Sequence, residues 1–293
     1  MRAFKMLASC VVALTIASAA GAQQIDWKKV DTTLGKTATV SGEVHRYGLP
    51  RSDLQVIVDG VAIKPALALG GWAAFQRGEA MVMGDLVLLE TEINPVMAKL
   101  IEGGIEITAV HNHLLRANPE TFYMHIGGHG DPVKMAEVIR SALALSKTSF
   151  DPPPAAPTPA PPIDLDTAQL DQIIGAKGTV NGGVYQFNVP RRDPITENGM
   201  TVPRAMGSAN AINFQSTGGG KAAITGDFVI TGDEVNPMIK ALRTNGIEVT
   251  ALHSHMLTEQ PRVFFMHFWA NDDQLKLAKG IRAALDKTAV AKS

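Results

Sequence analysis

The order of apolar and polar residues predicts both strands and helices along the chain. Segments 39–44, 54–58 and 80–89 combine β-branched residues with flanking Gly and Pro, so we expect strands there. Apolar residues at Met135, Val138, Ile139 and Leu143 follow the helical period after Asp131-Pro132, which predicts a helix. Asn94-Pro95 and Gly103-Gly104 are typical of the start and end of a shorter helix.

Residues 107–115, ITAVHNHLL, place two histidines one residue apart in an apolar run. Strand side chains alternate faces, so His111 and His113 should leave one face about 7 Å apart. A turn at Asn118-Pro119 and a strand over 121–126 would complete an antiparallel hairpin. If paired residue numbers sum to 236 or 238, His125 faces His111 or His113 and three imidazoles converge. If the sum is 237, Met124 takes that place, and the sequence leaves the register open.

The second half of the chain repeats this pattern. GGIEITAVHNHLL at 103–115 matches NGIEVTALHSHML at 245–257, and the same offset aligns Gly84-Asp85 with Gly226-Asp227. A Pro- and Ala-rich spacer over 150–163 separates the copies. We therefore predict two homologous α+β domains, 23–149 and 164–293, each a mainly antiparallel sheet with two or so helices. The two copies could pack as an intramolecular pseudo-dimer.

The N-terminus predicts export. Arg2 and Lys5 precede an apolar run that ends at Ala20-Gly21-Ala22, as in a cleaved signal peptide over 1–22. Cys10 lies before most of that run, so we expect a periplasmic or secreted protein without a lipid anchor or a transmembrane span. Lys and Arg number 27 against 28 Asp and Glu, and no basic patch stands out, which argues against a nucleic-acid partner.

Histidine is the residue type that carries candidate chemistry. Three imidazoles on one face are a familiar ligand set for a transition metal, with zinc the first expectation and copper the second. We assign the metal-ligand role to the three histidines of each copy: His111, His113, His125, His253, His255 and His267. The alternative is a structural role, in which the histidines bond to backbone carbonyls.

Glu92 and Glu234 occupy matching positions, and a carboxylate there could act as a general base. A carboxylate near a helix N-terminus is also stabilised by the helix dipole alone. The chain holds no P-loop and no dinucleotide fingerprint, so no nucleotide cofactor is expected.

Several motifs together resemble the LppY/LpqO family of exported proteins: Tyr47-Gly48-Leu49-Pro50-Arg51, Gly84-Asp85, Glu92-Ile93-Asn94-Pro95, His111-Asn112-His113 and Met124-His125. The resemblance covers the chain beyond the signal peptide in two copies and implies an exported protein whose domain has no established activity.

The leading hypothesis is a tandem-domain protein that binds a transition metal, or a small ligand through one, at a three-histidine site in each domain. A metal-dependent hydrolase of the cell envelope and an envelope scaffold without metal stay open, so whether the protein is an enzyme is undecided.

Overall fold

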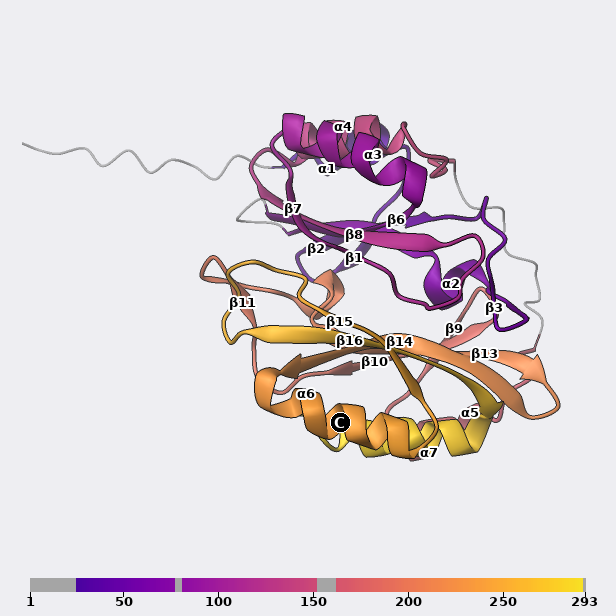
Figure 1. Cartoon of the computed structure of the whole chain (residues 1–293). Coiled ribbons are helices and arrows are strands. Elements are labelled where there is room, and N and C mark those ends of the chain that lie inside the picture. The colour runs from indigo at the N-terminus through magenta and orange to yellow at the C-terminus, as the bar shows by residue number, and fades with distance from the viewer. Residues whose placement is uncertain (1–24, 77–80, 152–161, 292–293) are drawn as a thin grey trace, which may run out of the picture.

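The computed structural model describes residues 25–76, 81–151 and 162–291 (Figure 1). The predicted signal peptide and most of the predicted spacer lie outside these ranges. None of the described helices is long and apolar enough to span a bilayer.

Each copy follows the same order of elements. The first comprises α1 (Trp27–Leu34), β1 (Thr39–Ser41), β2 (Val44–Pro50), β3 (Ile57–Val58), β4 (Val61–Ala62), α2 (Pro65–Ala68), β5 (Gly70–Gln76), β6 (Met81–Leu89), α3 (Glu90–Glu102), β7 (Glu106–His111), β8 (Thr121–His129) and α4 (Pro132–Leu143). The second comprises α5 (Thr167–Ile174), β9 (Thr179–Asn181), β10 (Val184–Pro190), β11 (Thr196–Glu197), β12 (Met200–Thr201), the 3₁₀ turn η1 (Arg204–Met206), β13 (Ala209–Gly218), β14 (Lys221–Thr231), α6 (Gly232–Thr244), β15 (Glu248–His253), β16 (Val263–Asp273) and α7 (Gln274–Leu285).

Each copy builds one six-stranded antiparallel sheet. The strand order is β1-β2-β5-β6-β8-β7 in the first copy and β9-β10-β13-β14-β16-β15 in the second, read from the matching edge. The predicted fold class, two α+β domains with mainly antiparallel sheets, is confirmed.

The two sheets pack face to face between two outer layers of helices (Figure 1). Each sheet buries one face against its own helices, with Val82, Leu86 and Leu88 of β6 in the first of these cores. Alternate residues of the same strands point to the other sheet. Two further apolar clusters lie there, and both draw residues from both copies: Met83 with Val229 and Phe265 in one, Val87 and Tyr123 with Trp269 in the other. The copies therefore form an intramolecular pair around a shared apolar interface.

Both short helices begin earlier than predicted. We expected Asn94 and the matching Asn236 to be N-caps, with Pro95 and Pro237 as the first helical residues, but the helices start at Glu90 and Gly232 and carry both prolines inside. The side chain of Glu92 accepts a hydrogen bond from the Leu89 amide at 2.8 Å, and Glu234 does the same for Thr231. A glutamate at the third position of a helix caps the first turn in this way. This capping places the start of each helix ahead of its Asn-Pro pair.

The register of the histidine hairpin differs from all three predicted sums, 236, 237 and 238. His111 pairs with Tyr123 and Ala109 pairs with His125, so the sum is even but smaller. The hairpin does not turn tightly at Asn118-Pro119, because Asn118 pairs with Ile57 of β3 instead and draws the connection away. An even sum still places His111 and His125 on one face, and the imidazoles converge.

Candidate metal centre

The six predicted histidines meet between the two sheets. His125 and His267 lie within β8 and β16, His111 and His253 end β7 and β15, and His113 and His255 follow just beyond. His125, His255 and His267 are buried, and the other three are half-buried. We call these six side chains the histidine cluster. The apolar clusters described above contribute buried residues on both sheets around it.

The imidazoles of the two copies stack on each other in a two-fold arrangement. His111 stacks on its counterpart His253, with ring centroids 3.4 Å apart. His113 stacks on His267 at 3.7 Å, and the reciprocal pair, His125 on His255, has the same separation. We expected one three-histidine site in each domain, but the structure brings both sets of histidines together.

Each of these imidazoles keeps a buried ring nitrogen without a hydrogen-bond partner among the described residues. Seven buried nitrogens of the histidine cluster make no hydrogen bond among the described residues, and each of the six histidines contributes at least one. Buried polar atoms are almost always paired in folded proteins, and an unpaired one costs about 1 to 3 kcal/mol. These nitrogens are therefore the candidate ligand atoms of the site.

Hydrogen bonds on the opposite ring nitrogen orient two of the imidazoles. Nδ1 of His267 lies 2.8 Å from the carbonyl oxygen of Gly226, so Nδ1 donates and Nε2 keeps its lone pair. His125 makes the matching backbone hydrogen bond to Gly84. Metal-binding histidines are commonly fixed in this way.

Glycine is required at both positions because neighbouring strands approach closely. A Cβ on Gly84 would lie 2.8 Å from the Trp72 carbonyl oxygen, and one on Gly226 would lie 2.0 Å from the oxygen of Ala211. The next residue of each pair, Asp85 or Asp227, lies opposite His125 or His267 in the sheet. The repeated Gly-Asp pair is therefore part of the site, and not the turn or bulge that such a pair commonly marks.

Both aspartates approach histidines of their own copy. Oδ2 of Asp227 lies 3.4 Å from Nε2 of His255, and Oδ1 lies 3.8 Å from Nε2 of His267. Asp85 makes the corresponding approaches to His113 and His125 at 4.0 Å. Oδ1 of each aspartate is buried without a hydrogen-bond partner among the described residues. The site thus offers two carboxylates in addition to its imidazoles.

Burial sets the protonation of these groups. It lowers the pKa of His111 to about 4 and that of His267 to about 3, and it holds the pKa of His113, His125 and His255 well below the ordinary value. It raises the pKa of Asp85 to about 7, against the nearby charge of Arg46. The imidazoles are therefore neutral near pH 7, which is the form that binds a metal.

The residues fit a metal ion by distance as well. Ligand nitrogens of His111, His113 and His125 all lie within 4.8 Å of one another, and so do those of His111, His253, His255 and His267. A tetrahedral zinc ion with bonds of about 2.0 to 2.1 Å separates its ligand atoms by roughly 3.3 to 3.4 Å. Small side-chain rotations would close that difference, and His111 belongs to both groups.

Glu92 and Glu234, the predicted general bases, lie elsewhere. Nη1 of Arg51 donates to Glu92 at 2.6 Å, and Nη1 of Arg191 donates to Glu234 at 2.5 Å. Each glutamate lies beyond the end of its strand. In the first copy β6 ends at Leu89, and at the rise of a strand this end lies roughly 13 Å from Asp85. The structure gives both a capping and ion-pairing role, and their catalytic role stays a prediction that this geometry does not favour.

The ion pair between Arg191 and Glu234 should make the stability of the second domain sensitive to acid. Burial alone would raise the pKa of Glu234, but hydrogen bonds from Arg191, Thr231 and Ala289 outweigh it and lower the pKa. A lowered carboxyl pKa contributes stability above the unfolded value of about 4.3 and loses it as the pH falls through the folded value. We expect the free energy of unfolding to fall below about pH 4.3, with a shallower slope in Glu234→Gln.

Denaturant titrations across pH 3 to 6, where this carboxyl titrates, measure that slope. Asp233→Asn is the matched control, because Asp233 is the exposed neighbour of Glu234 and should leave the slope unchanged. Equal slopes in all three proteins would contradict the role given to this ion pair.

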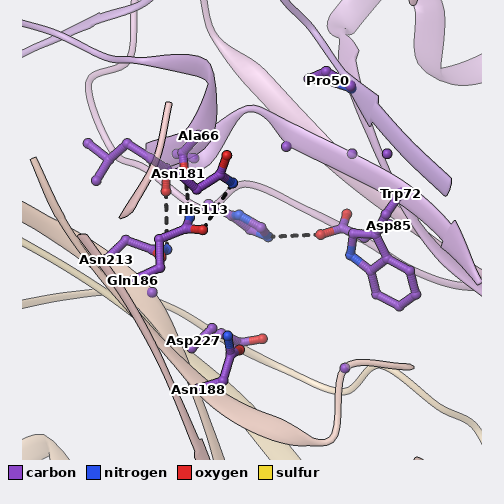
Figure 2. Close-up of a pocket in the computed structure, with 18 of the residues that line it drawn as sticks. Pro50, Ala66, Trp72, Asp85, His113, Asn181, Gln186, Asn188, Asn213 and Asp227 are labelled. Atoms are coloured by element: carbon purple, nitrogen blue, oxygen red, sulfur yellow. Dashed lines mark hydrogen bonds and ion pairs between the residues drawn. The ribbon is translucent and has the colours of Figure 1, made fainter. Parts of the chain in front are cut away.

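A large cavity opens beside the histidine cluster. Its volume is about 950 Å³, and both copies line it, with Asp85, His113 and His125 from the first and Asp227, His255 and His267 from the second. Figure 2 shows Asp85 and Trp72 on one side of this cavity and Asp227 and Asn188 on the other. A metal ion in the histidine cluster would therefore be reachable by a ligand.

Comparisons with known proteins agree with the repeat. A family model described as Domain of Unknown Function (DUF1259) matches residues 28–145 and 168–287. It supports two copies of an uncharacterised domain and does not confirm the LppY/LpqO resemblance. No curated protein matches the chain.

Among solved structures, a chain titled "Crystal structure of a trimeric bacterial microcompartment shell protein PduB" is similar at 15% identity, over 86% of this chain and 90% of that chain. The TM-score is 0.22, so no argument about function rests on that likeness.

Proposed function

We propose that this chain, which belongs in two tandem copies to the family described as Domain of Unknown Function (DUF1259), binds a transition metal between its domains. The proposal is based on the histidine cluster. The observation that carries this proposal is the convergence of seven unpaired, buried imidazole nitrogens on one site. In an interface that only holds the domains together, these unpaired polar atoms would be destabilising. Each copy supplies half of the site, so the fold of the pair positions the ligands.

Zinc is the metal that the donor set favours first, and copper second. Neutral imidazoles together with a carboxylate are typical zinc ligands. Imidazole also binds copper well, which makes copper the second expectation. The described part of the cluster includes no thiolate, which removes the softest ligands. Asp85 and Asp227 could complete the coordination or accept hydrogen bonds from bound water.

Elemental analysis of the full chain, purified without a histidine tag, tests the proposal. We expect near-stoichiometric zinc or copper in the wild type and loss of most of it in His111→Ala, which removes a member of both ligand groups. The double variant His113→Ala/His255→Ala should lose it as well.

His129→Ala is the matched control, because His129 lies at the exposed end of β8 outside the histidine cluster. Its metal content should equal that of the wild type. A wild-type chain that retains no metal after reloading at neutral pH, or a His111→Ala chain that keeps all of it, would refute the proposal.

Hydrolysis is a second candidate function, favoured by the cavity beside the cluster. A metal with an open coordination position can acidify a bound water to a pKa of about 7. Asp85 and Asp227 are the carboxylates within reach of such a water.

Export of the protein, expected from residues 1–22, likewise stays a proposal, and N-terminal sequencing of the protein from a periplasmic extract would test it.

A further inference from the structure

Two arginines, Arg46 and Arg204, line the cavity beside the histidine cluster among mostly small and amide side chains. Asn181, Gln186, Asn188 and Asn213 supply amides, and Gly48, Gly70, Ala209 and Ala211 leave the space open. We infer that this cavity binds a small organic oxyanion, a carboxylate or a phosphate, held between Arg46 and the metal of the histidine cluster. The inference rests on the proposed function, since the metal is one of its two contacts.

Arg46 is held in place from both domains. Its guanidinium lies 3.9 Å from the centroid of the Trp72 ring. Nη1 donates to the Ala205 carbonyl of the other copy at 2.6 Å, and among the described residues this is the one hydrogen bond that the side chain makes. A guanidinium has five N–H donors in a planar fork, so the donors left over suit a planar carboxylate or a phosphate.

The charges of the site favour an anion over a second cation. Arg46 lies close enough to Asp85 to interact with it electrostatically. A site that only held a metal ion would gain nothing from a buried positive charge nearby, because two cations repel in a low dielectric. An oxyanion between the metal and Arg46 would attract both cations and offset their repulsion.

The second copy has no arginine at the position that matches Arg46. Gln186 of β10 stands where β2 has Arg46, and its Nε2 donates to the Ala66 carbonyl at 2.8 Å. The metal-ligand residues are duplicated, but the Arg46 position is not. The arginine that the second copy brings to the cavity, Arg204, is instead an exposed residue of η1. We therefore expect one anion for each chain, oriented toward the Arg46 side of the cavity.

The volume indicates an organic molecule and not a free inorganic ion. About 950 Å³ lies near the upper end of the size of small-molecule sites and far exceeds a phosphate ion. The neutral amides around the cavity would bind the polar remainder of such a molecule.

Titration of the cobalt-loaded full chain with inorganic phosphate, and separately with succinate, tests the inference. Calorimetry measures affinity, and the visible absorption of cobalt reports a change in its coordination. We expect saturable binding of at least one of the two probes, with a change in the cobalt spectrum, and weaker binding by about tenfold or more in Arg46→Gln. Arg46→Lys should retain part of the affinity, and the metal content of both variants should equal that of the wild type.

Arg243→Gln is the control, because Arg243 is exposed on α6 away from the cavity. Thermal melting of every variant confirms that it is folded. Phosphate alone, succinate alone, or both would identify which oxyanion group the site takes. A metal-loaded chain that binds neither probe, or an Arg46→Gln chain that binds as tightly as the wild type, overturns this inference alone. A chain that loads no metal overturns the proposed function first.

Discussion

Chelation of the metal-loaded protein is expected to lower its free energy of unfolding by about 4 kcal/mol, relative to free metal at about a thousand times its dissociation constant. A metal that binds the folded pair and not the unfolded chain stabilises the fold by mass action. The effect should be large because removing the metal leaves seven unpaired imidazole nitrogens in the interface. Thermal or denaturant unfolding with and without a chelator measures it.

The histidine variants provide the control for that measurement. His113→Ala/His255→Ala should show no further loss on chelation, whereas His129→Ala should respond as the wild type does. If chelation leaves the unfolding transition of the wild type unchanged, the histidine cluster does not couple metal binding to folding.

Arg51→Met is expected to destabilise the first domain by about 3 to 5 kcal/mol. Arg51 is fully buried and donates to both carboxylate oxygens of Glu92, to Asp53 and to the Val87 carbonyl. Removing the guanidinium leaves the Glu92 carboxylate buried without its charge partner. The large cost comes from that uncompensated charge and not from the net value of the pair.

Denaturant unfolding measures this loss, and Lys99→Met is the matched control. Lys99 forms an exposed ion pair with Glu102, so its loss should change stability by less than about 1 kcal/mol. If Arg51→Met were as stable as Lys99→Met, the structural role given to Glu92 would be wrong, and its catalytic role would regain support.

The local part of the site could be predicted from the sequence because it follows from two periods. Alternation in a strand places His111 and His113 on one face, and the repeat offset transfers the same reading to His253 and His255. The even register then brings His125 and His267 to the same face. The antiparallel sheets follow from the same strand and turn signals.

The shared part could not be predicted, because it depends on how two distant segments pack. No local pattern reveals that His113 stacks on His267, since the contact arises from the face-to-face packing of the sheets. Asp85 was visible as a repeated residue, but a Gly-Asp pair commonly marks a turn. The helix starts could not be predicted from Asn-Pro, because Glu92 and Glu234 lie inside the first turn and cap it, whereas Asn-Pro places them before the helix.

X-ray absorption at the zinc edge of the zinc-loaded full chain tests whether the two domains hold a metal between them. We expect nitrogen and oxygen ligands at about 2.0 to 2.1 Å from the zinc, with the longer-range scattering of several imidazole rings. The imidazole scattering should disappear in His113→Ala/His255→Ala and persist in His129→Ala. Zinc that shows no imidazole scattering in the wild type, or no bound zinc at all, would contradict the claim that the two domains hold a metal between them.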